Sequence, residues 1–340
     1  MNKKKLIMRG LIAAAALIIV ALPCQTQSKE WPNILLGASQ LRGSYYPVMV
    51  ALSEQLKKHA NINATPVTIG SSGAIATRMG KGDSQVGLCG AFVLQDAYLG
   101  EGTFAKKGKQ PLRAIMSGHF RITQYITRAD SGIKKPEDMR GKKFMFLQAG
   151  APGTYNMGWA LLDAYGLRDK VTVLKWKSTT NMANAVGDGL VDVGLTGAPG
   201  SAAIMELARK TKIHFIPLSR EAQDKITNEL FPPFLPGIVP KNMYGAGNPP
   251  EDVRTLALPA WLIVRADVPN DLVYEVTRVI LDYPEEFGSY HVACKQYRLD
   301  KAIKKPVIAF HPGAIEYYKK KGMWGPNEDR INMDLMKKVQ

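Results

Sequence analysis

Short apolar runs alternate with helical patterns along most of this chain, and that alternation restricts the folds open to it. The first unit begins with the apolar run Ile34–Leu36, passes through small and polar residues, and continues as a helical pattern from Val48. A short apolar run bounded by glycine is typical of a buried strand. Pro47, just before the periodic residues, is typical of a helix start. Repeated units of this kind predict mostly parallel sheets covered by helices.

The same strand-and-helix pattern recurs and starts a second series at Phe144. Two series of units, in a chain of this length, predict two α/β lobes. The Pro- and Gly-rich segment Phe231–Pro259 is expected to mark a boundary, followed by a further strand at Trp261–Val264. The remaining expected strands are 64–70, 85–89, 112–116, 124–128, 144–147, 171–175 and 191–195.

The N-terminus has the pattern of a secretory signal peptide. Lysines and an arginine precede the apolar run Leu11–Leu22, and a polar stretch follows it. The run is shorter than the ~20 residues that a membrane span needs. We expect residues 1–28 to be removed, with cleavage near Ser28, and the mature protein to be periplasmic. Lipidation at Cys24 is the alternative, although Pro23 stands where such sites usually have a small residue.

The charge and the scattered ionisable residues exclude several classes of function. The formal net charge of +16 favours anionic partners, but the lysines are spread along the chain, and no nucleic-acid-binding module is present. We expect Cys89 and Cys294 to be free buried thiols, although an oxidising compartment permits a disulfide. The histidines show no metal-ligand spacing, so neither a metal nor a cofactor is expected.

Sequence signatures of enzymes are also absent. The chain has no nucleophile elbow, phosphate-binding P-loop or His-Glu-x-x-His motif. We therefore expect no enzymatic activity, while a catalytic site assembled from distant residues stays open. A secreted α/β enzyme remains the alternative from another class.

Four loops that follow apolar strands are rich in small residues and hydroxyl groups. They are Ser39–Tyr45, Gly70–Gly73, Gly150–Asn156 and Thr196–Ser201. Ligands of open α/β sheets bind at the carboxyl ends of strands, where small residues let backbone N–H groups approach an anion at a helix start. The loops therefore predict a cleft that binds a small organic anion, a carboxylate above all. Read singly, each loop is an ordinary turn.

Particular side chains in these loops and near them are candidates for ligand contacts, each with a structural alternative. The planar guanidinium of Arg42 suits a carboxylate, and the alternative is a surface arginine. Tyr45 and Tyr155 are candidates for the walls of a pocket or for the edge of the core. Gln124 is expected in a hinge or in the core.

The segment Gly43–Pro47, GSYYP, resembles the GTYYP segment of the TAXI family, the solute-binding subunits of TRAP transporters. Further similar segments follow in order over roughly residues 33 to 325, among them Asp138–Lys143, Leu161–Leu167, Val264–Pro269 and His311–Ala314. The resemblance implies a type II periplasmic-binding-protein fold with a hinge. It also implies a receptor that closes on a solute and delivers it to an ion-coupled TRAP permease. An ABC permease or a membrane sensor is the alternative partner.

On this fold, lobe I is expected to comprise 29–127 and 256–340 with the C-terminal helices, and lobe II 128–255. The chain departs from the family in the pocket loops, with Gly90-Ala91-Phe92 after one strand, Ile75 in a helix and Arg42 in the first loop. These departures imply an anionic ligand with an apolar or aromatic portion. We expect the protein to be a monomer. The expected ligand-binding residues are Ser39, Arg42, Ser44, Tyr45, Ser71, Ser72, Gly73, Phe92, Thr154, Tyr155, Asn156, Gly197, Ala198 and Pro199.

Overall fold

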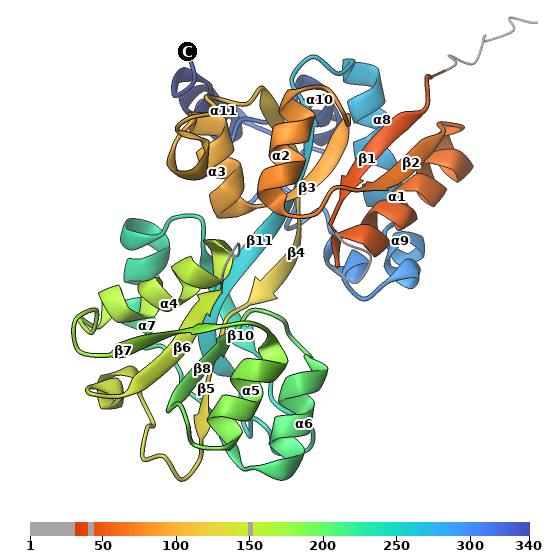
Figure 1. Ribbon diagram of the computed structural model, residues 1–340. Coiled ribbons are helices and arrows are strands. Elements are labelled where there is room, and N and C mark those ends of the chain that lie inside the picture. The colour runs from red at the N-terminus through yellow and green to blue at the C-terminus, as the bar shows by residue number, and fades with distance from the viewer. Residues whose placement is uncertain (1–30, 40–43, 149–151) are drawn as a thin grey trace, which may run out of the picture. The chain divides into compact units, whose positions relative to one another are not determined.

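Two β-sheets organise the computed structural model, which describes residues 31–39, 44–148 and 152–340 (Figure 1). The first sheet contains β1 (Ile34–Ala38), β2 (Ala64–Thr68), β3 (Val86–Gly90), β4 (Leu112–Ile122), β10 (Leu235–Val239) and β11 (Val253–Arg265). The second contains β5 (Gln124–Arg128), β6 (Lys143–Gln148), β7 (Thr172–Trp176), β8 (Val193–Thr196) and β9 (Ile213–Phe215). The chain passes from one sheet to the other at Thr123, between β4 and β5.

The two sheets share one topology. Their strand orders are β2-β1-β3-β11-β4 and β7-β6-β8-β5-β9, and β10 extends the first sheet by pairing with β11. β1 is parallel to β2 and β3, and β6 is parallel to β7 and β8. Only β11 in the first sheet and β5 in the second run against the other described strands. The predicted mostly parallel α/β architecture is therefore confirmed.

Helices cover these sheets, as the sequence pattern predicts. They are α1 (Tyr45–Ala60), α2 (Ser72–Gly80), α3 (Ala91–Leu99), α4 (Pro152–Ala164), α5 (Thr179–Gly187), α6 (Ala202–Lys210), α7 (Arg220–Lys225), α8 (Asn270–Leu281), α9 (Pro284–Tyr290), α10 (Pro312–Lys320) and α11 (Pro326–Lys337). Short helical turns lie at Gly102–Phe104, Pro136–Met139, Ile226–Leu230 and Cys294–Gln296. No described helix is long and apolar enough to cross a membrane.

Several helices begin earlier than the sequence predicts. The first helix begins at Tyr45 instead of Val48, with Pro47 in its first turn. Backbone N–H groups in that turn have no helical acceptor, so a proline there removes no hydrogen bond. Likewise α4 begins at Pro152, which places Thr154 to Asn156 in its first turns and not in a loop. Proline is well tolerated at the first position of a helix.

The segment Phe231–Pro259, in which a boundary is expected, supplies β10 and half of β11. Its prolines fit the sheet for separate reasons. Pro236 lies in β10, which is an edge strand, and Pro259 lies beside an irregularity in the register of β11 with β4. Edge strands and bulges are the places where a sheet tolerates proline.

Each sheet has its own apolar core. Trp261 of β11 is fully buried and packs edge-on against Phe310 at a centroid distance of 5.9 Å. The core beside the second sheet includes Ile126, Trp176 and Met182, and also Val253 at the start of β11. The strand β11 therefore contributes to both cores. Cys89 and Cys294 are both free and buried, as expected.

Candidate ligand-binding site

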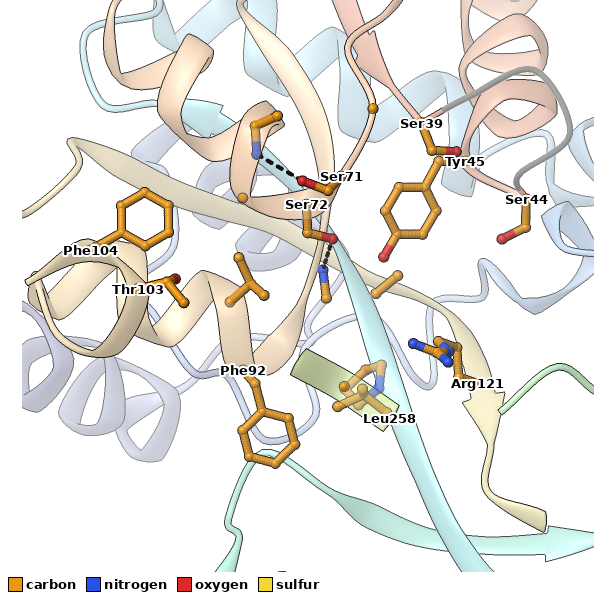
Figure 2. Close-up of a pocket in the computed structure, with 18 of the residues that line it drawn as sticks. Ser39, Ser44, Tyr45, Ser71, Ser72, Phe92, Thr103, Phe104, Arg121 and Leu258 are labelled. Carbon is orange, nitrogen blue, oxygen red and sulfur yellow. Dashed lines mark hydrogen bonds between the residues drawn. The ribbon is translucent and has the colours of Figure 1, made fainter. Parts of the chain in front are cut away.

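A pocket of about 650 Å³ lies at the carboxyl ends of β1 and β3 and beside β4 and β11. Its polar residues come mainly from the first sheet's loops and helix starts, and its apolar residues from α3 and β11 (Figure 2). The lining comprises Ser39, Ser44, Tyr45, Gly70, Ser71, Ser72, Gly73, Ala74, Gly90, Phe92, Val93, Thr103, Phe104, Lys107, Arg121, Gly153, Leu258, Pro259 and Ala260.

One wall is made of hydroxyl groups at the start of α2. Ser71 caps this helix, since its Oγ accepts a hydrogen bond of 3.3 Å from the backbone N–H of Ala74. Gly70 before it has a φ of +115°, a conformation that favours glycine. The first N–H groups of the helix, at Ser72 and Gly73, have no acceptor within the helix. They lie at the positive end of the helix dipole, which suits an anion.

Tyr45 and Ser72 add two further hydroxyls. The Oγ of Ser72 accepts a hydrogen bond of 3.1 Å from the backbone N–H of Gly90, which fixes the Ser72 side chain. Burial raises the pKa of Tyr45 to about 12, so its hydroxyl stays protonated at neutral pH and can donate a hydrogen bond. Figure 2 shows the side chains of Tyr45, Ser72 and Arg121 around one space.

Arg121 supplies the positive charge on the other side of this space. It lies near the end of β4, where it is the register partner of Leu258 in β11. Its Nη2 donates a hydrogen bond of 3.2 Å to Oγ1 of Thr154, in the first turn of α4. Burial lowers the pKa of the guanidinium, but an arginine remains charged at any physiological pH. Among the described residues, Arg121 forms no ion pair, and no carboxylate lines the pocket.

Two glycines allow the guanidinium to reach this position. A Cβ at Gly153 would lie 3.0 Å from Nη1 of Arg121, and a Cβ at Gly197 would lie 2.9 Å from its Nη2. Both distances are shorter than ordinary carbon–nitrogen contacts. Small residues at these two positions of the second sheet's elements therefore let a side chain from the first sheet come close.

The opposite wall is apolar. It includes Phe92 and Val93 of α3 and Leu258 and Pro259 of β11. Phe92 also packs edge-on against Phe234, with a centroid distance of 4.9 Å. A ligand in this pocket would meet hydrogen-bond donors, a cation and hydrocarbon on different parts of the wall.

The structure brings together half of the expected site residues. Ser39, Ser44, Tyr45, Ser71, Ser72, Gly73 and Phe92 all line the pocket. Thr154 and Gly197 contact Arg121 from the second sheet's side without lining the pocket.

The other expected residues are placed elsewhere. Tyr155 is 48% exposed and packs edge-on against Trp159, 5.8 Å away. Asn156, Ala198 and Pro199 are likewise absent from the lining, and Arg42 lies outside the described residues. Because α4 begins before them, Tyr155 and Asn156 lie on this helix and not in the expected loop, and neither belongs to the lining.

Sequence reasoning missed Arg121, Lys107 and the β11 residues. No local signal indicated Arg121, because it lies beyond the expected end of its strand at Met116 and three residues before the expected hinge residue Gln124. That glutamine is buried at the start of β5. Its Oε1 accepts a hydrogen bond from the hydroxyl of Tyr244, and its Nε2 donates one of 3.2 Å to the carbonyl of Ile122.

His119 contacts two residues of the pocket lining, Ser44 and Tyr45. Its Nε2 lies 2.9 Å from Oγ of Ser44, and its Nδ1 lies 3.2 Å from the hydroxyl of Tyr297. Its ring also meets that of Tyr45 edge-on at 5.4 Å. Burial lowers the pKa of His119 to about 4, so the imidazole is neutral at pH 7. The described residues contain no cluster of three or more His, Cys, Asp or Glu side chains suited to a metal ion.

Solved structures share this fold. XAC2383 from Xanthomonas citri, solved with chloride, has a TM-score of 0.50 and 12% identity, over 90% of this chain and 97% of that one. The same protein solved with ATP has a TM-score of 0.50 and 13% identity, over 90% of this chain and 96% of that one. The periplasmic aliphatic sulphonate binding protein SsuA from Escherichia coli has a TM-score of 0.49 and 11% identity, over 90% of this chain and 86% of that one. At identities this low, the two XAC2383 structures show the fold alone, which is the two-lobed periplasmic-binding-protein fold that the sequence predicts.

A family model matches residues 36 to 322, nearly the whole described chain. It is the model of the NMT1-like family, so membership of the TAXI family, which the sequence resemblance implied, is not shown. With this match and the fold described above, the chain belongs to the NMT1-like family.

Proposed function

We propose that this protein is an extracytoplasmic solute receptor that binds a small organic anion in the pocket beside Arg121. One observation carries the proposal: a partly buried guanidinium faces a pocket whose described lining contains no carboxylate. Removing a cation from water without a counter-charge is costly. A bound anion would supply that counter-charge.

The surrounding groups favour a carboxylate or a similar oxyanion. A guanidinium can bind two oxygens of one such group with parallel hydrogen bonds. The Tyr45 hydroxyl and the N–H groups at the start of α2 offer further donors. The apolar wall of Phe92 and Leu258 accommodates a hydrocarbon or aromatic portion of the ligand. An amino acid is a poor fit, because no described lining residue would pair with its ammonium group.

Lobe closure is the proposed mechanism of the receptor. Arg121 belongs to the first sheet, yet it donates to Thr154 of α4, which packs with the second. An anion on Arg121 would therefore make contacts with elements of both lobes. Such a ligand shifts the population toward the closed state, because it binds that state more tightly. The lobe limits 127/128 and 255/256 are part of this proposal.

The partner is proposed to be a membrane permease. The TAXI resemblance pointed to a TRAP permease, but the family match supports that partner no further. We therefore propose an ABC permease, or a sensor with this fold, as the partner in its place. The proposal includes a periplasmic monomer released from a signal peptide and without enzymatic activity. The signal sequence and Cys24 lie outside the described residues.

A thermal unfolding panel tests the ligand class. The chain lacking residues 1–28 is unfolded in the presence of monocarboxylates, dicarboxylates, sulfonates, phosphonates, amino acids and neutral sugars. A ligand that binds the folded state alone adds about 2.7 kcal/mol of stability at a hundred times its dissociation constant. We expect organic anions to raise the midpoint. Stabilisation by sugars or amino acids, with none by any anion, would refute the proposal.

A further inference from the structure

A second cation lies in the same pocket, away from Arg121. Lys107 follows the short helical turn Gly102–Phe104 and belongs to the pocket lining. In Figure 2, Thr103 and Phe104 of this segment lie on the opposite side of the view from Arg121. The two cations therefore come from different parts of the chain, and they are the charged residues of the described lining.

Contacts with α2 orient the Lys107 side chain. Its Nζ donates a hydrogen bond of 3.2 Å to Oγ1 of Thr77, and that hydroxyl donates one of 2.7 Å to the carbonyl of Gly73 in the pocket wall. Its Nζ also lies 5.2 Å from the centroid of the Phe104 ring, within reach of a cation–π interaction. Lys107 forms no ion pair within the described part of the chain. Its ammonium group is thus held beside the pocket wall with donors left over.

Much of the remaining pocket wall is apolar. Val93 and Phe92 of α3 and Leu258 of β11 belong to it, with the hydroxyls of α2 on the other side. A compact anion could satisfy Arg121 and leave Lys107 solvated. A longer ligand with a second anionic group would pair with both cations and bury its spacer against these side chains.

We propose that Lys107 is a second anion-binding residue of this pocket and that the ligand is an elongated dianion whose two charged groups flank an apolar spacer. This inference rests on the proposed function. It adds that one residue selects for the length and the second charge of the ligand. Because Lys107 is exposed, the attraction is modest and depends on salt concentration.

Isothermal titration with matched ligands tests the inference. The probes are straight-chain dicarboxylates and disulfonates of graded length, each with the monoanion of the same spacer. The proteins are the wild type, Lys107→Gln and the control Lys109→Gln, which changes a lysine of the same loop outside the lining. We expect Lys107→Gln to weaken the best dianion about two- to fivefold, to leave its monoanion unchanged, and to lessen the salt dependence. Lys109→Gln should change neither.

The outcomes separate the two proposals. Equal effects of Lys107→Gln on dianions and monoanions, or no effect on either, would overturn the role of Lys107 while leaving anion binding at Arg121 in place. A wild type that binds none of the anions would overturn both. A dianion preference that Lys107→Gln and Lys109→Gln reduce equally would assign it to general charge and would also overturn the inference.

Discussion

Protonation of His119 should destabilise the folded protein as the pH falls. Burial is the largest cause of its low pKa, and electrostatic interactions with His291 and Arg121 lower it further. In the folded state the imidazole titrates at about pH 4, compared with 6.5 for the unfolded chain. The unfolded state therefore binds a proton first. The stability that this depressed pKa contributes is fully present above about pH 6.5 and is lost as the pH falls toward 4.

The magnitude follows from the difference between the two pKa values. That difference is about 2.5 pKa units, and each unit corresponds to about 1.4 kcal/mol, so the full loss is about 3 kcal/mol. Roughly 2 kcal/mol of it should be lost between pH 7 and pH 5 by the same linkage relation. A glutamine at this position cannot titrate and can still hydrogen-bond to Ser44 and Tyr297.

Urea unfolding of the wild type and of His119→Gln at a series of pH values measures this contribution. The free energy of unfolding of the wild type should fall relative to the variant by about 2 kcal/mol between pH 7 and pH 5. Other titrating groups change both proteins alike and cancel in the difference. A difference that stays constant over this range would refute the reasoning and place the folded-state pKa of His119 near its ordinary value.

Three further predictions concern the pocket, the core and the thiols. Gly197→Ala should keep the fold but push the guanidinium of Arg121 out of place, since the added Cβ would lie 2.9 Å from Nη2; titration calorimetry should show about tenfold weaker anion binding. Trp261→Ala should cost about 3–5 kcal/mol in chemical unfolding, and Trp261→Phe clearly less, because the buried indole N–H has no hydrogen-bond partner among the described residues. Burial raises the pKa of Cys89 and Cys294 to about 12, so a thiol reagent should label neither until the mature chain is denatured, and labelling of the native protein would contradict their burial.

The sequence predicts the elements whose signals are local. The strand Gln124–Arg128 has the bounds expected for it, because its central residues Tyr125, Ile126 and Thr127 favour strands and turn signals follow it. Helix α5 likewise begins at the expected Thr179. Where the first residues of a helix are tyrosine or proline and not periodic apolar residues, as in α1, the expected start is late.

The pairing of distant strands is what the sequence does not reveal. Only Leu112–Met116 of β4 is expected as a strand, because the Ser-Gly-His segment 117–119 interrupts the apolar run, yet β4 continues to Ile122 by pairing with β11. That pairing sets Arg121 opposite Leu258. The position of this arginine in the pocket therefore depends on the pairing of residues more than a hundred positions apart in the sequence. Local sequence patterns do not indicate that pairing. The serine loops follow their own strands, so they could be predicted.

Anion affinity in an Arg121 variant tests the central claim most directly. The measurement is titration calorimetry of the most stabilising anion with the wild type, Arg121→Gln and the control Arg113→Gln. Arg113 lies on the same strand, packs over the ring of Tyr98 and is absent from the pocket lining. Loss of a charged hydrogen-bonding group from the site should weaken binding about tenfold or more in Arg121→Gln, and Arg113→Gln should bind as the wild type does. Equal affinity of the wild type and Arg121→Gln, with both proteins folded, would contradict the account.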